Sequence, residues 1–403
     1  MRVAVLGGGL QGCSVAIALA QKGVEVALFD RNADLLTRAA SANEGKIHLG
    51  YMYAGDPTLR TAGLMMQGAL SFAPFLSDHL GIAPHTFAIS APAVYVTHRE
   101  SQKSPEGVSG YMHAVHKLVQ NAIQTVGGSY FGLDLRRPLR NWSAAEIDQE
   151  FNSHEIHAAI TSPEVAIDPV ALAVLVGSCV KQTRKIELFL EHDVTSVHRG
   201  AHMEVVSTAF GQRRRHRFDH VVNALWDGRL AIDSELGLLP TWGWIHRLKY
   251  GISFKPPPDA PLTRSITVVL GPFGEVVSYA NGTVYLTWYP DCLKASTTAV
   301  RPPLWRTSPE EPLRSEIMHG TLLALSNIMP ALRRCNVERI SDVRVRGGPI
   351  VARGQTDIDD PDSELHHRFE IGVSSFGNYH SIDPGKLTMA PFFAAECARR
   401  ILG

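Results

Sequence analysis

The sequence has few cysteines, no excess charge of either sign and no long apolar run. Its five cysteines are odd in number and form no C-x-x-C pair, which argues against a disulfide framework and favours a reducing compartment. Lysine plus arginine equals aspartate plus glutamate, at 39 each, so no net field attracts nucleic acid or an anionic membrane. No stretch reaches the roughly 18 uninterrupted apolar residues of a spanning helix. We therefore expect a cytoplasmic protein without a transmembrane segment or a nucleic-acid partner.

Repeats, low-complexity tracts and metal-binding motifs are also missing. The 18 histidines form no H-E-x-x-H motif and no short cluster with cysteine, so we predict no metal site. A chain of 403 residues is long for one domain, and two domains are the better expectation.

The most informative segment of the chain is its beginning. An apolar strand at residues 3–6 runs directly into a G-x-G-x-x-G sequence at residues 7–12, the fingerprint of a dinucleotide-binding turn. Its first glycine permits the tight turn, its second lets the backbone approach a pyrophosphate, and its third lets the following helix pack closely on the strand. The N-terminus of that helix favours negative charge. The predicted cofactor contacts here are Gly7, Gly9, Leu10, Gln11 and Gly12.

The residues after the fingerprint complete the expected strand, helix and strand. An alanine-rich helix covers residues 14–20, and a second strand covers residues 24–29 and ends at Asp30, which Arg31 follows. An acid at this place accepts hydrogen bonds from a ribose 2′-hydroxyl and repels a 2′-phosphate. The prediction is therefore FAD or NAD and not NADP, with Asp30 and Arg31 as cofactor contacts.

The segment at residues 41–53 separates FAD from NAD, because it is too polar and glycine-rich to continue a simple run of strand and helix. It reads Ser-Ala-Asn-Glu-Gly-Lys-Ile-His-Leu-Gly-Tyr-Met-Tyr. This Asn-x-Gly-x-Ile-His-x-Gly run resembles the FAD-dependent D-amino-acid oxidase superfamily, and most of all its L-2-hydroxyglutarate dehydrogenase and glycerol-3-phosphate dehydrogenase branches, where Met52 would be aromatic. The resemblance implies FAD as cofactor and a segment that crosses the pyrophosphate and reaches the flavin. The implied contacts are Ser41, Asn43, Gly45, Ile47 and His48.

The resemblance also implies a fold in the α/β (α+β) class, with a Rossmann-like FAD-binding domain that is discontinuous in sequence. We assign residues 1–55, 156–235 and 341–403 to it. Residues 56–155 and 236–340 would form a substrate-binding domain whose antiparallel sheet roofs the flavin.

Local patterns fill in several elements. Asp168 and Pro169 predict the start of a helix. Residues 203–209 and 217–222 read as a hairpin around a solvated basic turn at 211–216, and Asn281-Gly282 predicts a second hairpin. A C-terminal helix is expected at 390–402. Further cofactor contacts implied by the resemblance are Val194, Ala224 and Gly377.

Residues 382–388 read Ile-Asp-Pro-Gly-Lys-Leu-Thr and resemble a run of the glycerol-3-phosphate dehydrogenase branch. A helix starting here would direct its backbone N–H groups at the flavin N1 and C2 carbonyl region and favour the anionic reduced ring. The expected contacts are Gly385, Lys386, Leu387 and Thr388.

Four residues are candidates for catalysis or substrate binding. His48 could be a base beside the flavin, a structural histidine or a covalent flavin anchor, and the Tyr53 hydroxyl could bind substrate. Arg346 aligns with an arginine that holds the substrate carboxylate in glycine-oxidase-like members, a task suited to guanidinium. His380 is a candidate second clamp.

The predicted function is FAD-dependent oxidation of a C–N bond in an amino acid or secondary amine that carries a carboxylate, by hydride transfer to flavin N5. Oxygen or another carrier would accept the electrons. One alternative is a 2-hydroxy acid or polyol-phosphate dehydrogenase, and another is an FAD-holding subunit without substrate chemistry of its own. A flavin monooxygenase would need a Gly-Asp motif that residues 383–385 lack. Oligomeric state stays open.

Overall fold

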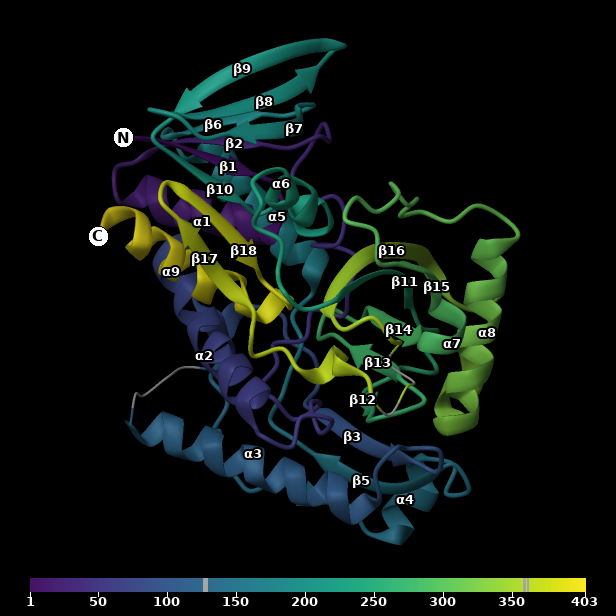
Figure 1. Cartoon of the computed structure of the whole chain (residues 1–403). Coiled ribbons are helices and arrows are strands. Elements are labelled where there is room, and N and C mark those ends of the chain that lie inside the picture. The colour runs from purple at the N-terminus through teal and green to yellow at the C-terminus, as the bar shows by residue number, and fades with distance from the viewer. Residues whose placement is uncertain (126–129, 358–359, 361) are drawn as a thin grey trace.

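The computed structural model describes residues 1–125, 130–357, 360 and 362–403. Two large sheets organise the chain (Figure 1). The first has the order β17-β18-β10-β1-β2-β6, and its strands run parallel except for β17. Its strands are β1 (Arg2–Leu6), β2 (Glu25–Phe29), β6 (Ile186–Phe189), β10 (His220–Asn223), β17 (Gly372–Phe376) and β18 (Tyr379–Asp383).

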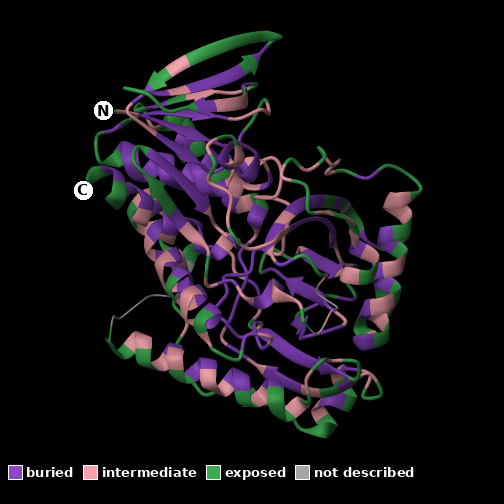
Figure 2. Cartoon of the chain, in the orientation of Figure 1, coloured by how far each residue is buried: buried purple, intermediate pink, exposed green. Residues whose placement is uncertain are grey.

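Alternation along β1 explains why this sheet is covered on both faces. Val3 and Val5 belong to a core shared with α1 (Leu10–Gln21), α5 (Pro169–Gln182) and α9 (Ala390–Leu402). Ala4 and Leu6 point the other way, into a core closed by a small antiparallel sheet, because successive strand side chains face opposite sides. That small sheet contains β7 (Asp193–His198), β8 (Met203–Ala209) and β9 (Gln212–Phe218). The strands of the first sheet are accordingly mostly buried (Figure 2).

The second sheet has the order β15-β11-β14-β13-β12-β3-β5-β4, with β16 also paired to β11. Its pairs are mostly antiparallel, and β12 and β3 run parallel. Its strands are β3 (Ala93–His98), β4 (Arg140–Asn141), β5 (Ile156–Thr161), β11 (Trp244–Lys255), β12 (Ser265–Val268), β13 (Gly274–Ser278), β14 (Val284–Trp288), β15 (Leu293–Thr297) and β16 (Ser341–Arg353).

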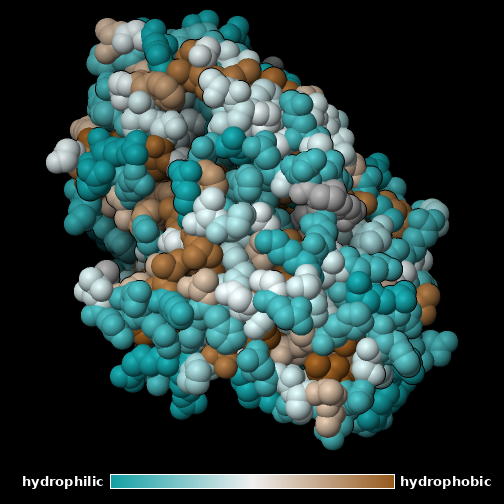
Figure 3. Space-filling model, turned by 60° about the horizontal axis from the view of Figure 1, so that its bottom comes forward, coloured by the Kyte–Doolittle hydropathy of each residue, from teal (hydrophilic) through white to brown (hydrophobic). Residues whose placement is uncertain are grey.

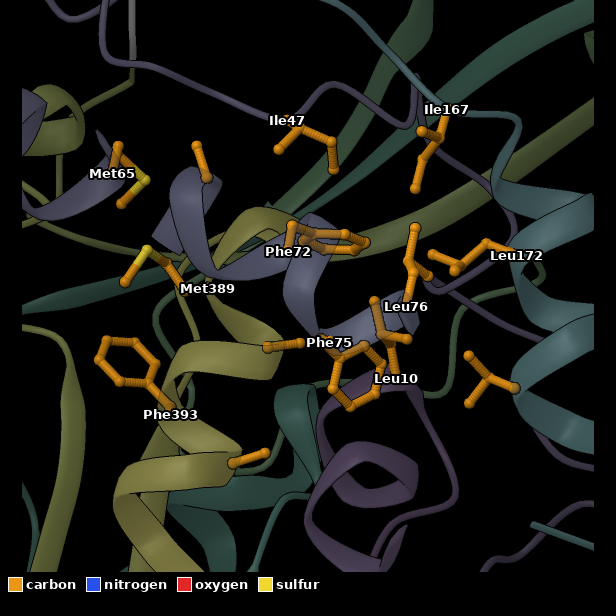
Figure 4. Packing of buried hydrophobic residues seen from close by; sticks show 14 of the residues in the cluster. Leu10, Ile47, Met65, Phe72, Phe75, Leu76, Ile167, Leu172, Met389 and Phe393 are labelled. Carbon is orange, nitrogen blue, oxygen red and sulfur yellow. The ribbon is translucent and has the colours of Figure 1, made fainter. Parts of the chain in front are cut away.

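Helices close the remaining faces. Ile317 and Leu325 of α8 (Leu313–Ile328) and Ile147 of α4 (Ala144–Glu150) share a core with the second sheet. The long helix α2 (Arg60–Leu80) contacts α9 and α3 (Pro105–Thr125). Figure 4 shows Phe72, Phe75 and Leu76 of α2 among residues of α1, α5 and α9. Short elements complete the chain: α6 (Arg229–Glu235), α7 (Tyr289–Cys292), η1 (Pro84–Thr86), η2 (Trp226–Gly228), η3 (Pro330–Arg334), η4 (Glu364–His366) and η5 (Leu387–Met389).

The predicted fold class is confirmed, and two details need correction. Residues 156–161 and 341–353, which we assigned to the FAD-binding domain, form β5 and β16 of the second sheet. The basic run at 211–216 is not a turn, since most of it lies in the exposed strand β9. The turn is instead Phe210-Gly211, where both residues have positive φ, as a two-residue hairpin turn requires.

Two local predictions hold. The Asp168 carboxylate caps α5 by accepting from the N–H groups of Val170 and Ala171, at 2.9 and 3.3 Å. Asn281-Gly282 turns the chain between β13 and β14.

None of the described helices combines the length and apolarity that a membrane crossing requires. The face in Figure 3 is mainly hydrophilic, with small scattered apolar areas.

Candidate active site

A long cavity runs from the glycine-rich turn after β1 to the second sheet. At one end it is lined by residues 7–11, residues 30–32 and Val194. Residues 36–40 and 42–44 line its middle, and side chains of β11, η4 and the loop before η5 line its far end. The cavity therefore joins the two sheets, as a site for a long cofactor and a substrate requires.

The glycine turn has the geometry of a phosphate site. Gly7 has φ +102°, and a Cβ there would lie 2.6 Å from the Ala224 carbonyl oxygen. A Cβ on Gly12 would lie 1.8 Å from the Gly7 carbonyl oxygen, whereas a Cβ on Gly9 would meet nothing within 4 Å. Gly9 thus leaves open space beside the cavity. No described side chain caps the start of α1 and no acid lies in its first turn, so the N–H groups of this turn can bind an anion.

Asp30 stands beside this turn. Its carboxylate accepts hydrogen bonds from the N–H of Gly8 at 2.7 Å and from the N–H and side-chain amide of Asn32, each at 2.8 Å. A carboxylate can accept further bonds, so Asp30 can still receive ribose hydroxyls. Arg31, Val194 and Ala224 line the same end of the cavity.

Two buried ion pairs and one buried histidine–carboxylate hydrogen bond hold the crossing segment at residues 43–48 in place. Lys249 of β11 lies 3.3 Å from Glu44, Glu275 of β13 lies 2.7 Å from Lys46, and Glu164 lies 3.2 Å from His48. Gly45 between them has φ +64°, and a Cβ there would lie 1.8 Å from the Ile167 carbonyl oxygen. This glycine is therefore required by packing.

Several predicted cofactor contacts do not line the cavity but support it. Thr388 donates to the Lys46 carbonyl and accepts from the His48 N–H, and the Tyr130 hydroxyl donates to the Ile47 carbonyl. Gly377 lies in the turn between β17 and β18. The predicted contacts outside the cavity lining are Gly12, Ser41, Gly45, Ile47, Gly377 and Thr388.

At the far end, polar atoms without partners converge. His48 Nε2, the Tyr53 hydroxyl, His366 Nδ1 and Arg247 Nε are buried and have no hydrogen-bond partner among the described residues. All four side chains line the cavity. The Tyr53 ring centroid lies 5.7 Å from that of His48 and 5.9 Å from that of His366. Buried polar groups are almost always paired in native proteins, so this set marks where polar groups of a ligand belong.

His48 presents a lone pair to the cavity. Its Nδ1 faces the Glu164 carboxylate at 3.2 Å, so Nδ1 carries the ring proton and Nε2 is an acceptor. Burial lowers the pKa of His48 even though Glu164 favours its charged form. Glu164 is held by the Leu49 N–H at 2.6 Å and by the Tyr95 hydroxyl.

The same end is electropositive. The buried Arg368 guanidinium donates to the carbonyls of Leu365 and Gly385, at 3.1 and 2.9 Å, and has no carboxylate partner in the described part of the chain. Burial lowers its pKa, and Arg247 lowers it further. Burial, Arg368 and Lys249 lower the pKa of Lys386 to about 8, against the opposing effect of Glu44.

Histidine at position 366 stays uncharged in this field. Burial is the main cause that lowers its pKa to about 3, and the charges of Arg368 and Lys386 act in the same direction.

Two predicted substrate residues lie elsewhere. Arg346 is exposed on β16 and donates to the Thr37 carbonyl at 3.1 Å. It pairs with Gly251 in the sheet register, whereas the cavity lies farther along at Lys249 and Arg247. His380 lies inside the first sheet, with its Nε2 3.1 Å from His220 Nδ1 and its Nδ1 2.9 Å from the Ser375 hydroxyl. Neither side chain lines the cavity, so both assignments as substrate clamps are corrected.

The sequence analysis missed the cationic residues that do line the far end: Arg247, Lys249 and Arg368, together with His366. Arg247 and Lys249 alternate with apolar residues along β11, and charges on one face of an otherwise apolar strand are a signal that could have been used. His366 and Arg368 carry no comparable pattern, because a loop brings them in.

Comparison with known proteins shows the family of this chain. Residues 2–372 match the family described as DAO, FAD dependent oxidoreductase. The chain belongs to this family. A stretch of 75 residues is 32% identical to the FAD-dependent monooxygenase FPY4 of Fusarium mangiferae, and it covers 19% of each chain. The match thus spans about a fifth of that curated relative.

Solved structures share the fold over nearly the whole length. Glycine oxidase from Geobacillus kaustophilus has a TM-score of 0.68 at 15% identity, covering 99% of this chain and 95% of that one. Iminodiacetate oxidase from Chelativorans sp. BNC1 has a TM-score of 0.67 at 15% sequence identity, and the match covers 100% of this chain and 95% of that one. L-alpha-glycerophosphate oxidase from Mycoplasma pneumoniae, with FAD bound, has a TM-score of 0.66 at 16% sequence identity, and the match covers 100% of this chain and 94% of that one.

Proposed function

We propose that this protein oxidises the C–N bond of a small amino acid or secondary amine that carries a carboxylate, with FAD as its cofactor. One observation carries the proposal. Buried polar atoms without a partner among the described residues lie beside Arg368, which has no described carboxylate partner, at one end of a cavity whose other end suits a dinucleotide. When bound, FAD supplies the redox chemistry by accepting a hydride from the substrate carbon.

The residues that line the cavity support an assignment of the cofactor contacts. The pyrophosphate would meet the free N–H groups at the start of α1, and the ribose would meet Asp30. Residues 42–44 and the loop at Gly385, Lys386 and Leu387 would hold the remainder, since all of them line the cavity. A positive charge at Lys386 stabilises negative charge nearby.

The substrate carboxylate would bind Arg368, with Arg247 as second donor. Guanidinium can grip a carboxylate through two parallel hydrogen bonds, and a buried cation without a counterion gains most from such a partner. Both side chains line the cavity. Arg247 Nη1 is paired with Asp357 at 3.2 Å, but its Nε has no hydrogen-bond partner among the described residues and can donate to the substrate.

An amine suits this end only in its neutral form. A protonated amine would need a carboxylate partner. Among the described residues that line the far end of the cavity, the acid is Glu44, and it is already paired with Lys249. Nearby cations lower the pKa of a bound amine, so the lone pair that C–N oxidation needs is available. His48 Nε2 can accept a hydrogen bond from the amine N–H.

The second candidate is oxidation of a 2-hydroxy acid, favoured by the same lone pair of His48. An alcohol must lose its hydroxyl proton as the ketone forms, and a histidine of lowered pKa backed by Glu164 is a suitable base. The two candidates differ in how much they need this histidine.

The test is anaerobic addition of amino acids, secondary amines and 2-hydroxy acids to the FAD-loaded protein while its visible spectrum is recorded. Bleaching by an amine supports the proposal, bleaching by a hydroxy acid alone replaces it with the second candidate, and readmitted air separates oxidase from dehydrogenase. Flavin that no compound bleaches would overturn both in favour of an FAD-holding subunit. His48→Gln should abolish alcohol oxidation and leave amine oxidation measurable.

A further inference from the structure

A second cleft opens where β11, β14 and β16 meet residues 41–43 and the start of α5. Arg344 and Arg346 of β16 lie opposite Ser253 and Gly251 of β11, so both arginines line one face of the sheet. Lys255 lines the same cleft. Three cations from two neighbouring strands are thus gathered around one hollow.

The arginines are short of partners. The Arg344 side chain makes no hydrogen bond or ion pair with any residue that the structure describes, and the Arg346 side chain donates only to the Thr37 carbonyl. Lys255 donates to the Asn281 carbonyl at 2.6 Å. Guanidinium carries five donors, so most of the donor capacity in the cleft is unused.

Two acids line the cleft and do not neutralise it. Asp168 is engaged as the cap of α5, and its other oxygen accepts from the Asn281 amide at 2.8 Å. Asp342 is exposed, with φ +53° at the start of β16. Three cations and two acids line the cleft, so its net charge is +1.

A buried hydroxyl without a partner lies in the wall. The Tyr285 side chain lines the cleft, and its hydroxyl has no hydrogen-bond partner among the described residues. It lies over Gly251, since a Cβ there would be 2.2 Å from the hydroxyl oxygen. The position of the Tyr285 side chain therefore depends on glycine at this point of β11.

The cleft and the cofactor cavity share a wall. Ala42 and Asn43 line both, and Arg346 in the cleft holds the carbonyl of Thr37, a residue that lines the cavity. A ligand that fixes Arg346 would therefore also fix the loop beside the cofactor.

We infer that this cleft is a second binding site, distinct from the active site, for a small oxyanion of the phosphate or carboxylate type. Arg344 and Arg346 provide the charged donors, and Lys255 adds positive charge at its edge. Through Arg346 and Thr37 the bound anion perturbs the environment of FAD.

The test is titration of the FAD-loaded protein with inorganic phosphate and, separately, with citrate, by calorimetry at constant ionic strength set with chloride. We expect saturable binding, weakened at least tenfold in the double variant Arg344→Gln/Arg346→Gln. The matched control is Arg213→Gln/Arg214→Gln, which removes two exposed arginines from β9 and should bind as the original protein does. Whichever anion binds more tightly identifies the type of ligand.

The active site also attracts anions, so a second variant separates the two sites. Binding that survives in Arg368→Met and disappears in the double variant supports the second site. Binding that disappears in Arg368→Met and survives in the double variant overturns it, as does the absence of saturable binding by either anion. Saturation without a change in the visible spectrum of FAD overturns the coupling through Thr37.

Discussion

The two ends of the main cavity are built in different ways. The glycine end comes from one contiguous stretch, residues 7–12, together with Asp30, and it presents backbone N–H groups and open space at Gly9. The far end comes from segments separated by more than a hundred residues, at His48, Arg247 and Arg368, and it presents buried charged and polar side chains. The first end is specified by local chain geometry and the second by tertiary structure.

This difference has an energetic side. Burying a charge is costly unless it is paired, and Glu44 and Lys46 are each paired with an opposite charge outside the crossing segment. Within the part of the chain that the structure describes, Arg368 and Lys386 have no such pairing with a carboxylate. The far end therefore gains stability when an anion binds, whereas the glycine end mainly needs to avoid steric conflict.

The largest expected effect tests the steric character of the glycine end. Gly12→Val places side-chain atoms where a Cβ alone would lie 1.8 Å from the Gly7 carbonyl oxygen, so strand and helix must separate. We expect protein without flavin and a free energy of unfolding lower by about 3 kcal/mol, measured by absorbance and urea denaturation.

Gly9→Ala is the matched comparison, because its Cβ meets nothing within 4 Å. The urea midpoint should stay near the original value while the affinity for FAD falls, since the methyl group enters the space beside the cavity. Equal loss of stability in both variants would show that the glycine turn is a packing feature without a cofactor role.

The next effect tests the far end. Arg368→Met removes the buried guanidinium, and we expect kcat/KM for a carboxylate-bearing substrate to fall about 10²- to 10³-fold with FAD content unchanged. Arg368→Lys keeps the charge and loses the two parallel donors, so it should recover part of the loss. Steady-state kinetics with the flavin spectrum as control would measure both. Loss of FAD in Arg368→Met would show that the far end also holds the cofactor, and it would contradict the assignment of separate cofactor and substrate ends.

The same contrast explains how much could be predicted from the sequence. The strand, turn and helix at residues 3–20, the cap at Asp168 and the turn at Asn281-Gly282 depend on neighbours in the chain, and all were predicted. The first sheet and the antiparallel second sheet followed from the family resemblance. Local rules and a recognised motif were therefore enough to predict the fold and to propose the cofactor end of the candidate site.

The substrate end was beyond these rules. Arg346 was chosen by alignment with a motif, but the register of β16 on β11 places it opposite Gly251 and away from the cavity. His366 and Arg368 reach the cavity from the loop that joins β16 to β17, and nothing local in that loop indicates its path. Pairing register and loop path are tertiary properties, and one sequence alone does not determine them by inspection.

A smaller effect concerns stability in acid. His366 has a folded pKa of about 3, below the roughly 6.5 of an unfolded histidine, so between these values the unfolded chain binds a proton that the folded chain does not. Stability therefore falls as the pH falls, by about 1.4 kcal/mol per pH unit below 6.5 for this group. In His366→Gln the loss between pH 7 and 5 should be smaller by about 2 kcal/mol, measured by urea denaturation. His157→Gln, at an exposed position of β5, should keep the original slope, and identical slopes in all three proteins would refute the expectation.

The smallest effect sharpens the electrostatic side of the comparison. Lys386 has a pKa of about 8, so it loses its charge as the pH rises from 7 to 9, and a bound carboxylate then loses one nearby cation. We expect the dissociation constant of acetate, read from the perturbed flavin spectrum, to rise about fivefold over this range, as a loss of about 1 kcal/mol implies. Acetate has no amine, so its own charge stays constant. In Lys386→Arg the dissociation constant of acetate should not change with pH, because guanidinium stays protonated. In Lys386→Met it should also be constant, but at the high value that the original protein reaches at pH 9. A profile that keeps its slope in Lys386→Met would assign the titration to another group of the cavity.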